Sequence, residues 1–577
     1  MPSTSPYAEF AEILGIPQKK EKSGKESQSA LLVKMCSDVF LFHDRNDNIY
    51  GEIRADDGHT EVWPVRSRGF RRWLSGRFFV EQGKPPSSHA TADALLAIEA
   101  EGQHKGPELE VYTRIARFGN DVYLNLCNRH WESVQITSDG WNVVSASPVK
   151  FIRTKGMLEL PRPSADGRIE AINKLLNAQS PADYILMAAW LVQAMNPAGP
   201  YPVLVLEGPQ GSAKTFTTRV LRNIVDPSTA TVRATPREER DLVIAATNGW
   251  ICAFDNISSL PNWLSDGLCR LSTGTGFSTR TLHTDAEEMI FAASRPVILN
   301  GISQVVTRHD LMDRAIFVNL EPISEERRRE EKELLREFEE TRPLVLGGLC
   351  DAVSAALRNE GKVRFHRLPR MADFARWVVS AEEALSCGSG EFMASYTRNR
   401  ELAVDLTLDA DIVGSTILKL MEDRTEWAGT PTELLEQLGL LVKENVARSQ
   451  EWPKTATGLS KRIHRARTSL FQKGIKAEQG RTGKERLWRF TRLEKEKPVT
   501  SVTTVINTKN QEPGCDTSGD ACESGPGKVS HHTQSDLLRN DTCDACDAFS
   551  PSLSVDVPDD KSGNEEAPDN EIPVYEV

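Results

Sequence analysis

The chain of 577 residues contains no run of eighteen apolar residues, and hydrophobic residues make up 39% of it. A helix needs about 20 apolar residues in a row to cross a bilayer, so no segment is expected to span a membrane. The first residues, MPSTSPYAEFAEILGI, also lack a basic segment followed by an apolar one, which argues against a secretory signal. We therefore expect a cytoplasmic protein.

Cysteine is scarce and scattered. The sequence holds ten cysteines, and six of them stand singly within regular-looking segments, which suits a reducing compartment better than a disulfide framework. A cluster near the end of the chain could in principle ligate Zn²⁺, and its members are Cys515, Cys522, His531, His532, Cys543 and Cys546. Only one C-x-x-C pair is present and the spacing is irregular, so we do not expect a zinc site there.

Basic charge is nearly missing from the last part of the chain. Residues 498–577 hold sixteen acids and four bases, and they carry the whole formal net charge of −12. The segment is rich in Ser, Asp, Pro and Gly, has no Trp and shows no periodicity. Such a composition cannot bury enough apolar surface to offset chain entropy, so we expect residues 494–577 to form a disordered acidic tail.

The length predicts several folding units, and the sequence pattern predicts a multidomain α/β protein. Short runs of alternating apolar and polar residues, separated by turn signals, predict an α+β domain rich in strands at residues 30–165. Helices are expected there around Phe70–Trp73 and Ala92–Ala100. The other predicted units are a flexible leader at residues 1–29, an α/β core at 166–325, a helical lid or linker at 326–410 and a basic unit at 411–493.

The most informative stretch is PVLVLEGPQGSAKT, residues 202–215. A buried-type strand at Val203–Leu206 enters a glycine-rich turn, and the helix that follows has apolar positions every four residues. This order is typical of a phosphate-binding loop, because backbone N–H groups at a helix N-terminus attract anions. The predicted cofactor-binding residues are Gly208, Pro209, Gln210, Gly211, Ser212, Ala213, Lys214 and Thr215.

Two side chains of this loop have predicted roles with ATP and Mg²⁺. Lys214 would neutralise phosphate charge, and the Thr215 hydroxyl would ligate the metal ion. The pattern asks for glycine at position 213, where this chain has alanine. A methyl group is tolerable there if the backbone stays right-handed, and we expect Ala213 to be right-handed for that reason.

A second motif follows about forty residues after Lys214. The run WICAFDNIS predicts a strand at Ile251–Phe254 with Asp255 at its carboxyl end, where an acid can ligate Mg²⁺. Many such ATPases place a second acid next, but this chain has Asn256. Either this asparagine positions water without acting as a base, or the acid comes from elsewhere, with Glu207 and Glu238 as weak candidates. Hydrolysis could then be slow.

Two further polar residues are tied to predicted strands. The strand PVILN ends at Asn300, whose side chain could touch the γ-phosphate and the attacking water, or could simply cap the strand. In LMDRAIFVNL, Arg314 precedes another apolar strand. An arginine there can stabilise transition-state charge at a neighbouring subunit's nucleotide, an effect worth roughly 10³–10⁵ in rate. The alternative is a structural salt bridge, with Asp313 as a candidate partner.

Between these motifs, two β-like pieces around Phe277–Leu282 and Met289–Ala292 flank a polar tip that carries Arg280 and His283. The order of motifs is a phosphate-binding loop, an acidic strand, a glycine-containing hairpin, a strand ending in asparagine, and an arginine before the next strand. This order resembles superfamily 3 helicases of the AAA+ class. It is most similar to the helicase-type ATPase half of primase–helicase proteins encoded by phages and mobile elements.

The resemblance implies a P-loop parallel-sheet core that assembles into a homo-oligomeric ring, with a hexamer expected. It also implies that the hairpin projects into the central channel and grips DNA. Arg280 and His283 would take that role, because a cation that faces phosphates gives sequence-independent affinity. No primase metal-binding acids are found in residues 30–160, so the primase half is taken as absent and a separate primase or polymerase becomes a candidate partner.

Residues 411–493 are predicted to form helices followed by a hairpin. The run Thr430-Pro431-Thr432-Glu433 is a strong helix start, with a capping threonine, a proline in the first turn and a glutamate three residues on. In the later helix, Leu459, Ile463 and Leu470 form an inward apolar stripe. This pattern is typical of a winged helix, a unit that also ends the related primase–helicase proteins.

The same unit is strongly basic, since residues 451–492 hold twelve bases against three acids. Such charge favours a surface that binds single-stranded or duplex DNA through phosphates rather than through base edges. A basic lid or protein-docking domain is the alternative. The predicted DNA-binding residues are Lys461, Arg462, Arg465, Arg467, Arg481 and Lys484.

Together these patterns predict an ATP- and Mg²⁺-dependent DNA helicase or translocase that serves DNA replication of a phage or mobile element. Its predicted catalytic residues are Asp255, Asn256, Asn300 and Arg314, and its predicted metal ligands are Thr215 and Asp255. A second hypothesis is an ATP-switched DNA-binding or assembly protein with little turnover. The asparagine at position 256 keeps that hypothesis open.

Overall fold

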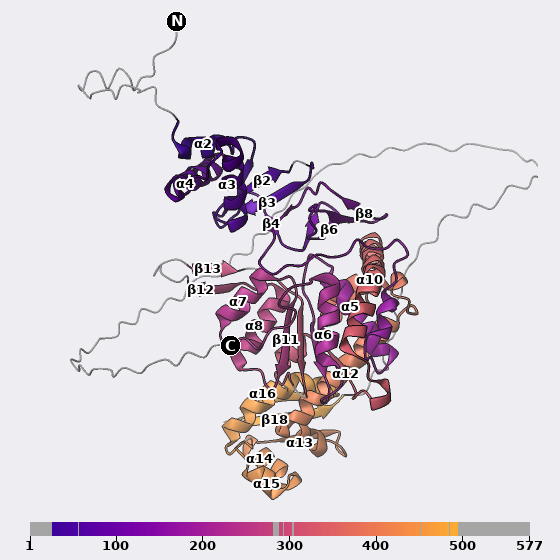
Figure 1. Ribbon diagram of the computed structural model, residues 1–577. Helices are drawn as coiled ribbons and strands as arrows, with labels where there is room; N and C mark the ends of the chain where they lie inside the picture. The colour runs from indigo at the N-terminus through magenta and orange to yellow at the C-terminus, as the bar shows by residue number, and fades with distance from the viewer. Residues whose placement is uncertain are drawn as a thin grey trace, which may run out of the picture. The chain divides into compact units, whose positions relative to one another are not determined.

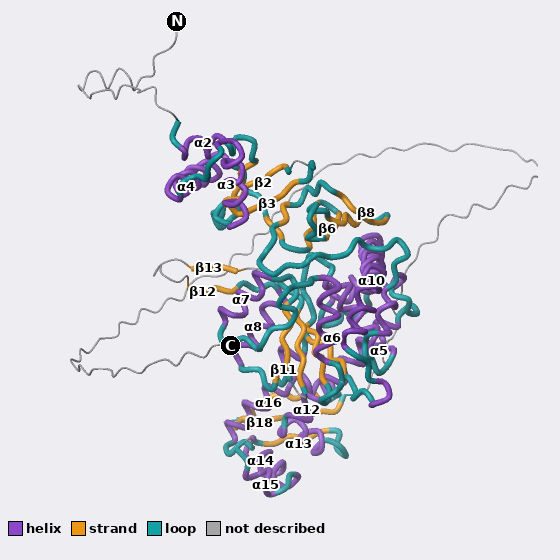
Figure 2. The backbone as a smooth tube through the Cα atoms, in the orientation of Figure 1, coloured by secondary structure: helices purple, strands orange, loops and turns teal. Residues whose placement is uncertain are grey.

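The structure, a computed structural model, describes residues 26–55, 57–280, 288–291, 294–302, 305–450, 452–483 and 485–493 (Figures 1 and 2). The expected leader up to residue 25, the acidic tail with its Cys and His cluster, His283 and Lys484 lie outside these residues. Within the described ranges, no helix is long and apolar enough to cross a bilayer.

The first described residues form a small α/β unit. An antiparallel sheet of β1 (Phe40–His43), β2 (Ile49–Arg54) and β3 (Thr60–Pro64) packs with α2 (Gln28–Lys34), α3 (Arg68–Gln82) and α4 (Ser88–Lys105). A serine side chain caps each helix, at Ser27, Ser67 and Ser87. Phe70 and Leu74 of α3 lie one turn apart and are fully buried in the core of this unit. The two helices predicted here are confirmed, and both are longer than predicted.

A second antiparallel sheet follows, with the order β5 (Ile115–Phe118), β6 (Asp121–Asn125), β7 (Ser133–Thr137) and β8 (Gly140–Val144). The short strands β4 (Val111–Tyr112) and β9 (Lys150–Phe151) pair in parallel beside it. Alternate residues of β6, Val122 and Leu124, belong to the same apolar core as α5 (Pro181–Ala194). This sheet therefore shares a core with elements that lie beyond the boundary expected at residue 165.

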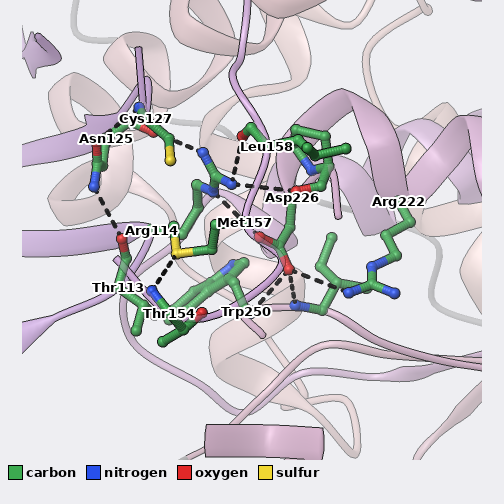
Figure 3. A network of polar contacts seen from close by, with 12 residues as sticks. Thr113, Arg114, Asn125, Cys127, Thr154, Met157, Leu158, Arg222, Asp226 and Trp250 are labelled. Atoms are coloured by element: carbon green, nitrogen blue, oxygen red, sulfur yellow. Dashed lines mark hydrogen bonds and ion pairs between the residues drawn. The ribbon is translucent and has the colours of Figure 1, made fainter. Parts of the chain in front are cut away.

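Buried charges fasten the same region to the elements that follow. Figure 3 shows the Asp226 carboxylate between the guanidinium groups of Arg114 and Arg222. Asp226 also accepts hydrogen bonds from the backbone N–H groups of Trp250 and Ile251, at 2.9 and 3.0 Å. All lone pairs of a buried carboxylate need such donors, because an unpaired buried charge is costly.

The central sheet is parallel, with the order β11 (Cys252–Ile257), β14 (Val297–Gly301), β10 (Val203–Glu207) and β15 (Ala315–Asn319). Helices cover both faces: α5 and α6 (Lys214–Val225) on one, α7 (Glu239–Asn248) and α8 (Asn262–Thr273) on the other (Figure 1). Side chains of β10 alternate between these faces, with Leu204 in the first core and Val203 in the second. A strand buried on both faces needs apolar residues at successive positions, and the sequence of β10 has them at Val203–Leu206.

A helical region follows, comprising η2 (Glu325–Arg327), α10 (Glu331–Asn359), η3 (Glu360–Lys362), α11 (Ala372–Ser380), η4 (Glu382–Ala384) and α12 (Glu391–Ala410). The helical lid expected at residues 326–410 is largely helical, and its longest helix, α10, runs through Pro343. Gly347 permits this long helix to pack, because a Cβ atom there would lie 2.1 Å from the Ser164 carbonyl oxygen.

The last described unit contains α13 (Ile412–Leu420), β16 (Glu426–Gly429), α14 (Pro431–Leu441), α15 (Glu444–Arg448), α16 (Ala456–Gln472), β17 (Ile475–Thr482) and β18 (Glu485–Arg492). The predicted helix start is confirmed, since Thr430 and Glu433 form reciprocal capping bonds at the first turn of α14. The predicted hairpin is β17 and β18. The structure adds β16, which pairs with β18 and makes the sheet three-stranded.

Candidate active site

The loop between β10 and α6 is held tightly against the segment that follows β15. At Gly208 a side chain has no room, because its Cβ atom would lie 2.1 Å from the carbonyl oxygen of Leu320. Asn177 donates its side-chain N–H to the backbone oxygens of Ser212 and Glu321, at 3.2 and 2.7 Å. The loop is therefore fixed by neighbours on both sides, and Asn177 is a residue that sequence reasoning missed.

The backbone of Ala213 is left-handed, with φ of 60°. The expectation of a right-handed backbone was wrong. The chain must reverse here to start α6, whose first hydrogen bond runs from Thr217 N to the Ala213 carbonyl. Glycine makes such a reversal without steric cost, whereas an L-residue loses about 1–2 kcal/mol. The surrounding contacts of the loop must supply that energy.

The Lys214 side chain folds back over the mouth of the loop. Its ammonium donates to the carbonyl oxygens of Gly208 and Pro209, both at 2.7 Å. Partial burial lowers the pKa of Lys214, and the nearby Asp255 carboxylate acts in the opposite sense. The loop thus presents a positive charge beside the N-terminus of α6, which is the arrangement that attracts an anion.

The two predicted metal ligands lie together. The Thr215 hydroxyl donates to Asp255 Oδ1 at 3.1 Å, although the two residues are forty positions apart. Asp255 lies within β11 rather than after it, because the strand continues to Ile257. The Asp255 N–H donates to the carbonyl of Arg233 at 2.9 Å, so the segment around this arginine lines the same strand. Sequence reasoning also missed Arg233, which lies in no recognisable motif.

Asn256 and Asn300 are joined at the end of β11. Asn256 has a left-handed backbone with φ of 56°, and its N–H donates to Asn300 Oδ1 at 2.9 Å. The buried Asn300 side chain also donates to the Thr218 hydroxyl on α6, at 2.9 Å. The oxygen and the nitrogen of the Asn300 amide therefore link β11 to α6. The side chain of Asn256 is exposed.

The two weak candidates for a second acid differ in their surroundings. Glu207 ends β10 and is buried, and its Oε1 atom accepts from the backbone N–H of Val305 at 2.9 Å. Glu238 is exposed and immediately precedes α7. The Glu207 carboxylate is thus used to hold the segment that follows β14.

Arg314 lies between α9 (His309–Met312) and β15, and donates to the Asp310 carbonyl at 2.7 Å. Asp313, the salt-bridge partner considered from the sequence, pairs instead with Arg400 at 2.5 Å. The Arg314 carbonyl accepts from the N–H of Val203, the first residue of β10. The phosphate-loop candidate follows the opposite end of β10, about 15 Å away at roughly 3.3 Å per residue. Arg314 therefore lies at the amino ends of the parallel strands, whereas its own chain's loop lies at their carboxyl ends.

The hairpin predicted between the motifs is present as β12 (Phe277–Arg280) and β13 (Glu288–Phe291), paired antiparallel. Arg280 pairs in register with Glu288 in the pair next to the tip. The tip itself, residues 281–287, lies outside the described part of the chain, and His283 with it.

A basic surface covers the outer side of α16. The inward stripe predicted from the sequence is confirmed, since Leu459, Ile463 and Leu470 are fully buried. Five predicted DNA-binding side chains are described; Lys461, Arg465, Arg467 and Arg481 are exposed, and Arg462 is half-buried. Within the described ranges none of these five forms an ion pair with an acidic side chain, so no such partner offsets their charge.

The other end of the same helix approaches α9. Ser469 Oγ lies 3.0 Å from His309 Nδ1, and Arg465 shares the lining of a cavity of about 210 Å³ with Arg400. The helix that carries the basic surface is therefore in direct contact with the short helix that precedes Arg314.

Two family comparisons bear on these regions. Residues 169–400 match the family model described as the actinomycete integrative conjugative element replication protein. Residues 413–507 match the model of the C-terminal domain of the same protein. These two regions belong to that replication-protein family. The first contains the parallel sheet and the loop, and the second contains the basic helix α16.

Solved structures give a more distant likeness. A structure described as the active helicase Cch of SCCmec type IV is 11% identical, with a TM-score of 0.42, over 79% of this chain and 93% of that one. The apo C-terminal region of NrS-1 is 12% identical, with a TM-score of 0.36, over 80% of this chain and 99% of that one. Both scores are low, so the likeness is partial. No protein with a curated description matches the chain.

Proposed function

We propose that this replication protein is an ATP-dependent DNA helicase or translocase. The observation that carries the proposal is the convergence of Lys214, Thr215 and Asp255 at one edge of a parallel sheet, with Thr215 Oγ1 and Asp255 Oδ1 at 3.1 Å. Ligands of open parallel sheets bind at the carboxyl ends of the strands, which is where this edge lies. The match to a replication-protein family supports the DNA of a mobile element as the substrate.

The residues fit MgATP. A hydroxyl and a carboxylate oxygen are the hard ligands that Mg²⁺ prefers, and they would hold the ion at Thr215 and Asp255. Residues 208–213 would supply backbone N–H groups to the phosphates. The Lys214 ammonium would exchange its two carbonyl partners for phosphate oxygens. Bound Mg²⁺ would neutralise the charge that develops on the transferred phosphoryl group.

The two asparagines would act on the attacking water. Asn256, with an exposed side chain beside Asp255, would orient water without removing its proton. Asn300 would sense the γ-phosphate by donating its side-chain N–H to a phosphate oxygen in place of the Thr218 hydroxyl. Because Thr218 lies on α6, this exchange would report the nucleotide state to the helix that follows the loop.

Arg314 would act in trans. It lies at the amino ends of the parallel strands, and its own loop lies at their carboxyl ends. It would therefore serve the nucleotide of an adjacent subunit in a ring of AAA+ type. The resemblance implies a hexamer. The proposed domains are an α+β domain at residues 30–165, the P-loop core at 166–325, a helical lid at 326–410, a winged helix at 411–493 and an acidic tail at 494–577.

DNA would be bound at two places. The β12–β13 hairpin that carries Arg280 would contact the strand in the central channel, and hydrolysis would move it along the DNA. The basic surface of α16 would hold single-stranded or duplex DNA through phosphates. A separate primase or polymerase would complete replication, because no primase metal-binding acids are recognised in the sequence of residues 30–160.

The test is steady-state ATP hydrolysis by the full chain, with and without single-stranded DNA. We expect DNA to stimulate turnover and Lys214→Ala to abolish it while leaving the fold intact. Lys174→Ala is the matched control, because Lys174 is an exposed lysine at the end of η1 (Ile169–Lys174), outside the phosphate-binding motif. Turnover in Lys214→Ala equal to that of the control would refute the site.

The trans role of Arg314 is tested by mixing two inactive variants. In a ring of equal amounts of Lys214→Ala and Arg314→Ala chains, about a quarter of the interfaces pair an intact Lys214 with a neighbour's intact Arg314. We expect the mixture to regain activity that neither variant has alone. No recovery, with rings demonstrably mixed, would place Arg314 outside the neighbour's site.

A second function remains in view because of Asn256. If no acid activates water, the protein would be an ATP-switched DNA-binding or assembly factor with little turnover. ATP binding that strengthens DNA binding, without DNA-stimulated hydrolysis, would favour this function over the helicase.

A further inference from the structure

Three potential metal ligands meet in the N-terminal part of the molecule, away from the site described above. They are Asp57 and His59, from the turn between β2 and β3, and His130, from the connection between β6 and β7. One ligand atom from each lies within 4.8 Å of the others. Asp57 is central, with one oxygen in contact with His59 Nδ1 and the other 3.4 Å from His130 Nδ1.

The His59 ring is aimed into this cluster. Its side chain is only 11% exposed, and its Nδ1 atom contacts one oxygen of Asp57. The other ring nitrogen, Nε2, lies 3.1 Å from Glu61 Oε1. When Nε2 donates its proton to Glu61, Nδ1 turns a lone pair toward the Asp57 oxygen, and a cation that draws this oxygen back from the ring can bind both atoms.

Glu61 has the contacts expected of a supporting carboxylate. Its second oxygen accepts from the indole N–H of Trp63 at 2.6 Å, which fixes the carboxylate beside the His59 ring. A metal-bound histidine almost always donates its free ring N–H to such a partner, which sets the tautomer and raises the basicity of the ligand.

The third ligand, His130, lies on a strained connection. Cys127 and Trp131 both have left-handed backbones, with φ of 56° and 54°. Asn125 holds the first by accepting from the Cys127 N–H at 2.8 Å, and the Arg153 guanidinium lies 3.8 Å from the centre of the Trp131 ring. Strain of this kind persists only where surrounding contacts enforce it, and it gathers at functional sites and ligand clamps.

His130 also has a partner on its other nitrogen, because Arg129 Nε donates to His130 Nε2 at 2.8 Å. This contact turns Nδ1 toward Asp57 and leaves the proton of the neutral ring on Nδ1. A neutral ring that binds a metal through Nδ1 carries its proton on Nε2, so the Arg129 side chain releases this contact when the ion binds.

We propose that Asp57, His59 and His130 bind a single Zn²⁺ ion. Two imidazole nitrogens and a carboxylate oxygen are a donor set that zinc takes, with water in the fourth position. The ion would fasten the β2–β3 turn, which belongs to the small N-terminal unit, to the β6–β7 connection, whose sheet shares the core of the parallel sheet. Its role is that of a structural clamp between two sheets.

The test is metal binding by the full chain after removal of metal with a chelator. We expect one Zn²⁺ per chain at this site, and His130→Ala and Asp57→Asn should each weaken binding at least about tenfold. Zinc should raise the Tm of the wild type and leave the Tm of His130→Ala unchanged. In the presence of chelator both proteins should melt alike, because His130 is 43% exposed and its removal leaves no buried cavity.

Two controls separate this site from other zinc ligands. His89→Ala removes an exposed histidine that pairs with Asp93 on α4, and it should bind zinc as the wild type does. Cys543→Ser with Cys546→Ser removes the C-x-x-C pair of the tail, and it should retain the ion. Bound Co²⁺ should show no thiolate charge-transfer absorption. Absence of binding, equal binding by His130→Ala and wild type, or loss of the ion in the tail variant would overturn the proposal.

Discussion

Arg114 and Asp226 form an ion pair inside the molecule, with Arg114 Nε 3.2 Å from Asp226 Oδ1 and both side chains at most 2% exposed. They lie 112 residues apart in the chain. The same guanidinium donates to the carbonyl oxygens of Asn125 and Leu158, at 3.0 and 3.1 Å. The sheet that follows the N-terminal unit is therefore fastened to the end of α6, the helix that begins at the phosphate-loop candidate.

Breaking this pair should destabilise the whole described core. We expect Arg114→Met to lower the free energy of unfolding by about 3–5 kcal/mol, because it removes the nearer of the two charge partners of a buried carboxylate. Urea unfolding followed by circular dichroism measures the change. Arg117→Met is the control, since Arg117 is 40% exposed and lies 3.9 Å from its partner Glu360. The control should change stability by about 0–1 kcal/mol, and an equal loss in both variants would contradict the prediction.

Ala213→Gly should stabilise the protein. Removing the methyl group relieves about 1–2 kcal/mol of left-handed strain, and the added freedom of the unfolded chain costs about 0.4–1 kcal/mol. A net gain of about 0–1.6 kcal/mol in the free energy of unfolding is expected. Ala92→Gly, at an exposed position of the helix α4, should instead lose about 0.5–1 kcal/mol. Similar losses in the two variants would mean that Ala213 is unstrained.

Asn256→Asp should raise the rate of ATP hydrolysis. Aspartate accepts a left-handed backbone almost as readily as asparagine, whereas glutamate does not. General-base catalysis contributes roughly 10²–10⁴ to rate, so we expect an increase in kcat of about tenfold or more. Asn256→Gly, which keeps the backbone but removes the amide, should lower kcat. An unchanged kcat in Asn256→Asp would mean that another group supplies the base.

The basic face of α16 should govern how salt affects DNA binding. Each phosphate contact contributes a slope of about −0.9 to the plot of log K against log salt for duplex DNA. We expect Lys461→Ala and Arg467→Ala each to reduce the steepness by about that amount, measured by fluorescence anisotropy. Arg489→Ala should change the slope less, because its guanidinium already pairs with Glu426 at 3.2 Å. Equal slopes in all three variants would place the DNA elsewhere.

Prediction from the sequence succeeded where the signal is local. The strand, turn and helix around Lys214 were recognised because each depends on neighbours a few residues away, and α6 begins at that lysine. The cap at Thr430 was found for the same reason. Local patterns did not show the length of α10, which runs through Pro343 although proline removes a hydrogen bond of the helix.

The sequence by itself therefore determined the types of residue available: a lysine and a threonine after a glycine-rich turn, an acid in the next strand motif, and a basic helix near the end of the described chain. Only the tertiary structure decided which of them meet. It paired Asn300 with Asn256 and Thr218. It set Arg314 at the amino ends of the strands, opposite the phosphate-loop candidate. It also joined Arg114 to Asp226. Contacts between residues far apart in the chain leave no local pattern, because they arise from the packing of whole elements.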